Sequence, residues 1–263
     1  ANVNYMHWGE EHLSGHHETV ATPNDPATSR LNESLYRFLP RTLIYSWFSA
    51  RDLENKRLKN EGKSRFSLHN RMFWNTVIPL AWALTIAKIT KGGMRAIMLF
   101  YLQGFGAASM LEVINYIEHY GLTRDKLPNG TYEPVNPTHS WNSPHRVSNS
   151  LLLKLQRHSD HHTYSMRPYH LLRNFKESPQ LPTGYPGMYI LSFFPPVFFW
   201  IMNPLVNAHS KNKERLLKNP DLPFSKSEEL IKAETSAYRK MLLFNTLSLV
   251  AGGALVNKIV SSV

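Results

Sequence analysis

Two adjacent apolar segments constrain the fold of this chain more than any other feature. Residues 72–90 and 96–117 are rich in Leu, Ile and aromatic side chains and almost free of charge. A helix needs about 20 such residues to cross the apolar core of a bilayer, and both segments reach that length. Lys91, Gly92 and Gly93 form a tight turn between them. The sequence therefore predicts a transmembrane helical hairpin whose two ends emerge on the same side of the membrane.

The rest of the chain favours further helices. Residues 32–50 repeat apolar side chains at helical spacing and suit a membrane interface or a surface helix equally well. We expect a loop over residues 121–149 and a helix over 148–164. Pro195 and Pro196 interrupt the apolar segment 188–206, which favours a kinked or re-entrant helix. Residues 241–260 are apolar enough for a last membrane helix. The expected class is an all-α integral membrane protein built as a helical bundle.

Composition narrows the partners and the chemistry. The formal charge is +11, and seven Lys and Arg residues lie in residues 51–71, between apolar segments. The positive-inside rule places such residues at the cytoplasmic ends of membrane helices, and we find no nucleic-acid-binding motif. The chain has no cysteine, which excludes iron–sulfur clusters, thiolate metal sites and disulfides. Any metal ion here must be held by histidine and carboxylate side chains.

Histidines form three groups. The first is the run EHLSGHH at residues 11–17, the second is HSDHH at residues 158–162, and the third is His119 alone, at the end of the second hairpin helix. On a regular α-helix, His12 and His16 point from one face while His17 lies about 100° around the axis. The second run again brings positions i, i+3 and i+4 onto one face. His7, His69, His170 and His209 are interpreted as structural, whereas His139 and His145 suit either packing or the orientation of ligands.

These groups predict a metal centre. Sites rich in imidazole with few carboxylates suit iron, copper, zinc or nickel. A zinc site closes with four ligands, and seven histidines on three segments are too many for one such site, so two metal ions are the economical interpretation. A centre beside a membrane hairpin favours a substrate that arrives from the lipid, which means a long apolar chain.

Six short runs of the sequence form a recognisable series: EHLSGHH (11–17), ATPNDP (21–26), NYIEHYGL (115–122), HSWNS (139–143), LQRHSDHH (155–162) and LPTGYPG (181–187). These runs closely resemble motifs of the alkane 1-monooxygenases, the bacterial omega-hydroxylases related to the membrane fatty-acid desaturases. The resemblance covers about residues 5–205, with the motifs in the family's order.

The resemblance implies a six-helix membrane fold with a non-haem centre of two iron ions on the cytoplasmic side. It implies hydroxylation of the terminal methyl of an alkane or fatty acyl chain, using dioxygen and electrons from a rubredoxin. It also implies location in a bacterial inner membrane, or in an organelle membrane of a eukaryote. No catalytic residue is expected beyond the metal ligands. The implied ligands are His12, His16, His17, His119, His158, His161 and His162.

Three further residues are expected to support those ligands. Asp160 and Asn142 are assigned to contacts behind the histidines. Glu112 lies inside an apparent membrane helix, seven residues before His119 and so on nearly the same face. An ionisable group at that depth is a functional candidate, although a hydrogen-bonded group between helices fits equally well.

The chain also departs from the family pattern. A further upstream histidine box and several membrane helices are absent, so the expected fold is a truncated one, and another polypeptide or a missing segment would have to supply that box. Residues 211–263 have no recognised counterpart, and we predict a di-iron oxygenase domain over 1–210 followed by an extra segment. One alternative is a non-catalytic structural subunit of a larger membrane assembly. A desaturase or fatty-acid hydroxylase of the same superfamily is a third.

Overall fold

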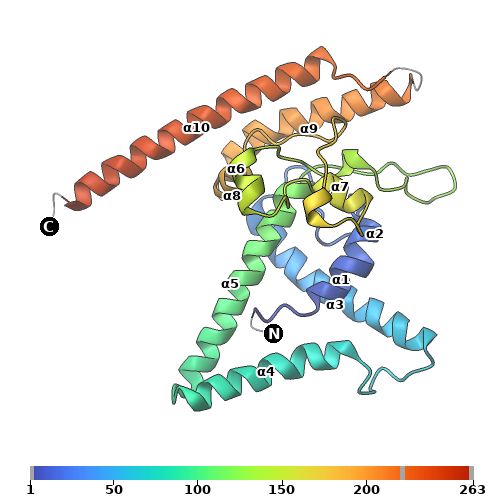
Figure 1. Ribbon diagram of the computed structural model, residues 1–263, viewed down its shortest axis with the longest axis vertical. Coiled ribbons are helices and arrows are strands. Elements are labelled where there is room, and N and C mark those ends of the chain that lie inside the picture. Colours follow the sequence, from blue (N-terminus) through green and yellow to red (C-terminus); the bar gives the residue numbers. More distant parts are fainter. Residues whose placement is uncertain (1–2, 220–222, 261–263) are drawn as a thin grey trace. The chain divides into compact units, whose positions relative to one another are not determined.

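The computed structural model describes residues 3–219 and 223–260, with side chains through residue 252. Within those residues every regular element is a helix and no strand is formed (Figure 1). The chain divides into two compact units. Unit 1 comprises Ala1–His119 and Thr123–Val135, and unit 2 comprises Tyr120–Leu122 and Asn136–Val263. The all-helical prediction is confirmed for the described residues, while the division after residue 210 stays a prediction about function.

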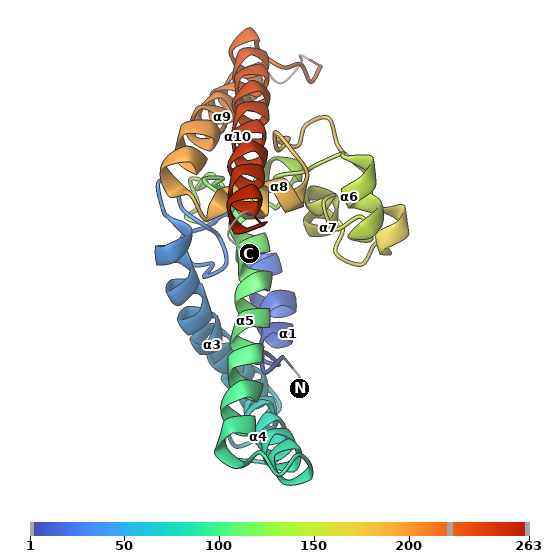
Figure 2. The same ribbon diagram turned by 90° about the vertical axis from the view of Figure 1, so that its left-hand side faces the viewer.

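Unit 1 is built from one interrupted helix and three long ones. The interrupted helix consists of α1 (Trp8–Glu11), the π-helical turn η1 (His12–His16) and α2 (His17–Thr19). The long helices are α3 (Leu35–Asn60), α4 (Arg71–Ile89) and α5 (Gly93–His119). Figure 2 shows α3 running along α5, and the two helices are in contact. Helix α3 continues ten residues beyond the predicted 32–50, because ion pairs at i+3 and i+4 from Arg57 support its polar end.

The predicted hairpin is confirmed as α4 and α5. They pack against each other across a turn in which Lys91 and Gly93 adopt left-handed φ values of 53° and 52°. Both helices are long and apolar enough to cross a membrane. Large apolar side chains on them stay exposed, among them Trp82 at 45% and Leu102 at 64%. Exposed apolar area on this scale marks a surface that meets a partner or lipid rather than water.

The last two turns of α5 have a different environment. Residues 112–119 are mostly buried, and Glu112 and His119 are 1% and 0% exposed. Gly104, halfway along, lets the N-terminal segment pass close by, since an added Cβ would lie 2.9 Å from the Val3 carbonyl oxygen. One helix thus carries an apolar exposed face in its first part and a buried polar cluster at its end.

A carboxylate clasp joins α3 to the start of α4. Glu54 is buried and accepts hydrogen bonds from Nε and Nη2 of Arg57, both at 2.7 Å. It also accepts one from the backbone N–H of Arg71, the first residue of α4, at 2.8 Å. Arg57 in turn donates to the His69 carbonyl oxygen at 2.9 Å. Glu54 therefore holds the entry to α4 against α3.

Unit 2 packs three longer helices beside a set of short ones. The short elements are η2 (Pro137–His139), α6 (Arg146–Leu151), α7 (His158–Thr163) and η3 (Tyr169–Leu171), and the longer ones are α8 (Tyr185–Ser192), α9 (Pro195–Leu217) and α10 (Glu228–Val260). Trp141 is buried, at 1% exposed, and its Nε1–H donates to the Tyr120 carbonyl oxygen at 2.9 Å. The Tyr120 hydroxyl donates to Asn203 of α9 at 2.7 Å.

Two predicted helices of unit 2 are broken in the structure. The expected helix over 148–164 is replaced by α6 and α7, because Leu153 and Lys154 take left-handed φ values of 50° and 61° that end a helix. The expected kink at the two prolines is a full break, since α8 ends at Ser192 and α9 starts with Pro195. Proline is favoured in the first turn of a helix, where its missing N–H needs no partner.

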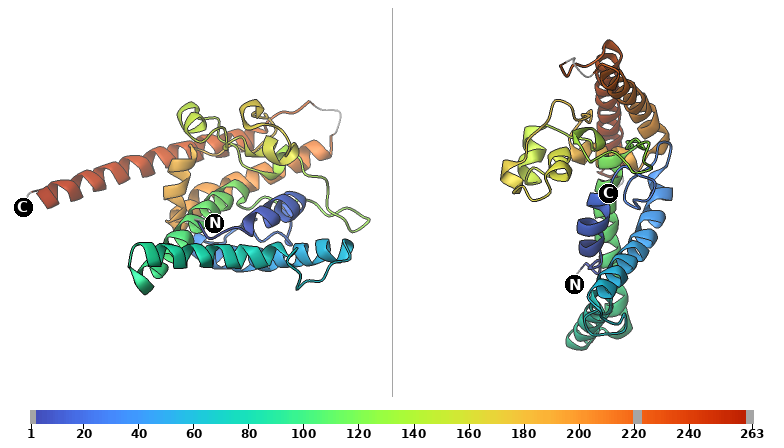
Figure 3. Two further views of the ribbon diagram at one scale, coloured as in Figure 1. Left: turned by 60° about the horizontal axis from the view of Figure 1, so that its bottom comes forward. Right: turned by 90° about the vertical axis from the view of Figure 1, so that its right-hand side faces the viewer.

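Helix α10 packs on α9 and continues past it (Figure 3). The predicted last span over 241–260 lies within α10 and is helical, but its side chains from residue 253 onward lie outside the described residues. Leu242, Leu247 and Val250 before that point are 49%, 59% and 66% exposed.

The clasp yields a stability prediction. Glu54→Gln removes the charge that Arg57 and the α4 N-terminus share, so we expect unfolding to become easier by about 1–3 kcal/mol. The measurement is the thermal midpoint of the purified protein in detergent. Glu61→Gln is the matched control, because Glu61 also pairs with Arg57 but has 38% of its side chain exposed, against 1% for Glu54. Equal shifts for the two variants would contradict the clasp.

His209 yields a prediction for pH. Burial in α9 lowers the pKa of His209 to about 4, despite a hydrogen bond with the backbone of Thr138. The unfolded chain binds the proton near pH 6.5, so the stability is complete above pH 6.5 and is lost as the pH falls towards 4, by at most about 1.4 kcal/mol per pH unit. His209→Gln should flatten this acid dependence of the thermal midpoint. His170→Gln, at an exposed position, should leave it unchanged.

Candidate metal centre

The π-helical turn sets the geometry of the first histidine group. In a π turn the residues at i and i+5 approach each other, in place of i and i+4. His12 Nε2 accordingly lies 3.2 Å from His17 Nε2. The expectation that His17 points about 100° away from His12 is therefore wrong, because it assumed a regular α-helix. Gly15 inside the turn allows the close approach of α3, since an added Cβ would lie 3.0 Å from Leu53.

His16 stacks on His12, with the ring centroids 5.2 Å apart, and also faces two neighbours outside this group. Its ring lies 4.8 Å, centroid to centroid, from that of His119 at the end of α5, and one ligand nitrogen of each residue lies within 4.8 Å of the other. Nδ1 of His16 is 2.8 Å from Oδ2 of Asp25. A carboxylate only accepts, so Nδ1 carries the hydrogen and Nε2 is the nitrogen left for a metal ion.

Asp25 is the supporting residue that the sequence interpretation missed. It lies in the proline-rich exit after α2 and is 2% exposed. Its own turn holds it in place, with Thr28 Oγ1 donating to Oδ2 at 2.5 Å and the Ala27 N–H donating to Oδ1 at 2.9 Å. The signal was present in the sequence, because Asp25 belongs to the motif ATPNDP, but nothing there tied it to His16.

The buried pair of His16 and Asp25 shifts the pKa of both residues. Burial alone lowers the pKa of His16, but the Asp25 carboxylate outweighs burial and raises this pKa to about 9. Burial raises the pKa of Asp25. The neighbouring His16 charge outweighs burial and holds this pKa below its usual range. The Asp25 carboxylate therefore favours positive charge at His16, which a proton on Nε2 supplies when no metal ion is bound and which a metal ion would supply in its place.

Unit 2 holds the second histidine group on α7. His158 Nε2 lies 2.9 Å from His162 Nε2, and both residues are buried. The His161 ring lies 5.6 Å from each of their rings, centroid to centroid. The predicted convergence of positions i, i+3 and i+4 is thus present in this short helix.

Asn142 and Asp160 hold α7 in position. Asn142 Oδ1 accepts a hydrogen bond from the Ser159 N–H at 2.9 Å, directly after His158. The Asp160 carboxylate is 0% exposed and pairs with Arg167 at 2.9 Å and with the Arg173 N–H at 2.7 Å. These contacts fix the backbone of the histidine helix, so both residues are placed for the supporting role expected of them, which stays a prediction.

Glu112 forms a hydrogen-bonded cluster inside unit 1. Oε1 accepts from the Tyr5 hydroxyl at 2.8 Å, and Oε2 accepts from the Thr42 hydroxyl at 2.8 Å and from Asn115 at 3.3 Å. The cluster ties the N-terminal segment, α3 and α5 together about two helical turns before His119. These contacts match the second interpretation of Glu112, a hydrogen-bonded group between helices.

The paired nitrogens fit a metal ion by distance and by chemistry. Two imidazole nitrogens bound about 2.1 Å from one ion, at 90–109° to each other, are separated by about 3.0–3.4 Å. The His12–His17 pair, at 3.2 Å, lies inside this range, and the His158–His162 pair, at 2.9 Å, lies 0.1 Å below its lower end. Neutral imidazole suits transition metals rather than magnesium or calcium. Each unit therefore offers nitrogens spaced for a transition metal.

With this geometry in place, comparison with known proteins defines the class. The chain belongs to the fatty acid desaturase family, which its residues 1–192 match.

Individual relatives within that class share one activity in their names. The chain is 45% identical over 209 residues to alkane 1-monooxygenase 2 of Alcanivorax borkumensis, across 80% of this chain and 54% of that protein. It is 42% identical to alkane 1-monooxygenase 1 of Pseudomonas aeruginosa, across 81% and 56%. It is 44% identical to the alkane 1-monooxygenase of Acinetobacter baylyi, across 79% and 50%. The resemblance drawn from the motifs is thus confirmed.

Two general statements follow from the family and the structure. The chain spans about half the length of the curated relatives it matches. The two apolar helices and the relatives together indicate association with a membrane, and the histidines indicate a metal centre.

The contact between Asp25 and His16 predicts an effect on metal affinity. Asp25→Asn removes the charge that orients His16, and the loss of such a contact costs about 10–100-fold in metal affinity. We expect that loss in a calorimetric titration of the metal-depleted protein with a divalent transition metal. Asp52→Asn makes the same change of charge at an exposed position paired with Arg51 and should bind as the unaltered protein does. Unchanged affinity in Asp25→Asn would show that Asp25 does not orient the ligand.

Proposed function

We propose that this protein is a non-haem di-iron monooxygenase that hydroxylates the terminal methyl of an alkane or fatty acyl chain. The observation that carries the proposal is the pairing of imidazole nitrogens at metal-binding distance in a chain 42–46% identical to alkane 1-monooxygenases. The proposed ligands are His12, His16, His17, His119, His158, His161 and His162.

The ligand set supports iron in a redox role. Two buried carboxylates beside these histidines have partners of their own: Asp25 accepts a hydrogen bond from His16 Nδ1, and Asp160 pairs with Arg167. Imidazole donors alone leave iron, copper, zinc and nickel open, and the similarity to monooxygenases favours iron. Two iron ions bound by these residues would supply the activation of dioxygen, with one oxygen atom entering the substrate and the other leaving as water.

The residues of the chain have three tasks in such a reaction. Asp25 holds His16 in the tautomer that presents Nε2. Asn142 and Asp160 fix the short helix that carries the second histidine group. Burial of His16, His119 and His158, at 0%, 0% and 2% exposed, keeps bulk water away from the metal-binding nitrogens, which protects reactive oxygen chemistry from side reactions.

Helix α5 supports a substrate that comes from the membrane. Its exposed apolar side chains, including Leu102 at 64% and Phe105 at 61%, lie on the same helix that ends in His119. A hydrocarbon chain dissolved in the bilayer would meet this surface before it met water. We further propose a six-helix membrane fold with the histidines on the cytoplasmic side, in a bacterial inner membrane.

The electron donor is proposed to be a rubredoxin-type protein. The supporting feature is the strong positive charge of the chain, +11 in total. An acidic electron carrier would be attracted to a basic surface, and such attraction acts mainly on the rate of association.

A combined metal and product assay tests the proposal. We expect the purified, intact protein to contain two irons per chain and to convert octane to 1-octanol when a rubredoxin and a reductant are supplied. His162→Ala and His119→Ala should each lose iron and activity, because each removes a ligand. His170→Ala, at an exposed histidine, should retain both.

The structural subunit and the desaturase would each give a different result in that assay. A folded protein that binds no metal would overturn the proposal and favour a structural subunit. An alkene product from an acyl chain would identify a desaturase instead.

A further inference from the structure

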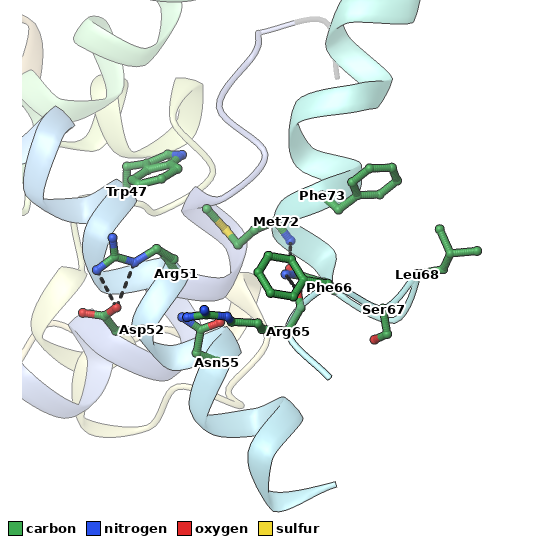
Figure 4. Close-up of a pocket in the computed structure, with 11 residues that line it drawn as sticks. Trp47, Arg51, Asp52, Asn55, Arg65, Phe66, Ser67, Leu68, Met72 and Phe73 are labelled. Carbon is green, nitrogen blue, oxygen red and sulfur yellow. Dashed lines mark hydrogen bonds and ion pairs between the residues drawn. The ribbon is translucent and has the colours of Figure 1, made fainter. Parts of the chain in front are cut away.

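A pocket separate from the histidines opens between α3 and the start of α4. Its volume is about 890 Å³. Trp47 and Arg51 of α3 form one wall, while Arg65 and Phe66 of the connecting loop and Met72 of α4 form the other (Figure 4). We refer to it as the α3–α4 pocket. All of its lining residues belong to unit 1.

The charges of the pocket suit one small anion. The Arg51 guanidinium donates to Asp52 Oδ1 at 2.8 and 2.9 Å and lies 4.9 Å from the centre of the Phe48 ring. The Arg65 guanidinium lies 4.8 Å from the centre of the Phe66 ring, and among the described residues no carboxylate forms an ion pair with it. Two cations and one carboxylate leave a net charge of about +1, which matches a phosphodiester with a single negative charge.

The rim of the pocket is apolar. Phe66 is 84% exposed, Leu68 is 69% exposed, and Phe73 on the first turn of α4 is 46% exposed. Two hydrogen bonds fix the backbone of the loop that carries Phe66 and Leu68. Trp74 Nε1–H donates to the Leu68 carbonyl oxygen at 2.8 Å, and Asn70 donates to the Arg65 carbonyl oxygen at 2.6 Å while it caps α4. A free phosphate would gain nothing from this rim, whereas a lipid would bury it.

The position of the pocket along the chain also favours a lipid headgroup. Helix α4 is one of the two helices suited to cross the membrane, and the pocket lies at its N-terminal end. Arginine and aromatic side chains are enriched at that level, where headgroups meet hydrocarbon. Basic pockets beside membrane helices are known to bind anionic headgroups.

We propose that the α3–α4 pocket binds an anionic phospholipid, with its phosphodiester between Arg51 and Arg65 and its acyl chains against the exposed apolar face of α4. Phosphatidylglycerol is the simplest lipid of this description. The proposal does not depend on the metal centre or on the reaction proposed above.

Lipid retention in nanodiscs tests it. The full chain is reconstituted in equal amounts of phosphatidylglycerol and phosphatidylcholine, and the lipids that stay bound are counted by native mass spectrometry. We expect phosphatidylglycerol to be enriched in the unaltered protein, and the doubly altered Arg51→Gln, Arg65→Gln protein to bind it about 5- to 30-fold more weakly, since each basic residue near a headgroup contributes a several-fold preference. Thermal midpoint and metal content show whether that variant is folded.

The matched control is Lys56→Gln with Lys59→Gln. It removes the same charge from the same basic stretch, at two exposed residues that do not line the pocket, and should keep the preference for phosphatidylglycerol. Equal losses in both proteins would reduce the effect to general surface charge and overturn the proposal. So would displacement of the lipid by millimolar inorganic phosphate. An arginine variant that keeps its lipid but binds an acidic electron carrier more weakly would assign the pocket to protein docking instead.

Discussion

Helix α5 must satisfy two different environments along one continuous backbone, and the rest of unit 1 depends on how it does so. Its first part presents large apolar side chains outward, which water would penalise and lipid would not. Its last turns bury Glu112, Asn115 and His119, which are tolerable only when hydrogen-bonded. The N-terminal segment and α3 supply hydrogen bonds to Glu112 through Tyr5 and Thr42, and Asn115 donates to the same carboxylate. Helix α3 therefore completes the polar end of α5, and the close approach at Gly104 lets the N-terminal segment reach it.

The local pattern predicts the long helices well because each carries its own signal. The bounds of α4 and α5 differ from the predicted segments by one to three residues, since length, apolarity and a turn at Gly93 are all readable from the sequence. The paired histidines could also be predicted, because three histidines within five or six residues have few possible arrangements on a helix. The family and the general kind of centre followed from the same motifs.

Other features had no local signal. The π turn at His12–His16 lies where Gly15 packs closely against α3, a contact that helical spacing does not display, so that spacing alone assigned His17 to the wrong face. The break between α6 and α7 occurs at Leu153 and Lys154, two residue types that seldom adopt left-handed φ. Asp25 reaches His16 only because the proline-rich turn folds back on the helix before it. Each of these depends on tertiary contacts that a single sequence does not display.

The π-helical turn also sets how the first histidine segment can vary in length. His12 and His17 meet because one extra residue is accommodated in a single turn. Removal of Leu13, Ser14 or Gly15 would leave His17 four residues after His12, at ordinary helical spacing, but would move His16 from i+4 to i+3 and turn it away from Asp25 and His119. A side-chain change at Leu13, which is 72% exposed, leaves that count intact. The segment thus tolerates altered chemistry at its outer face far better than altered length, and its insertions and deletions should be rarer than its substitutions.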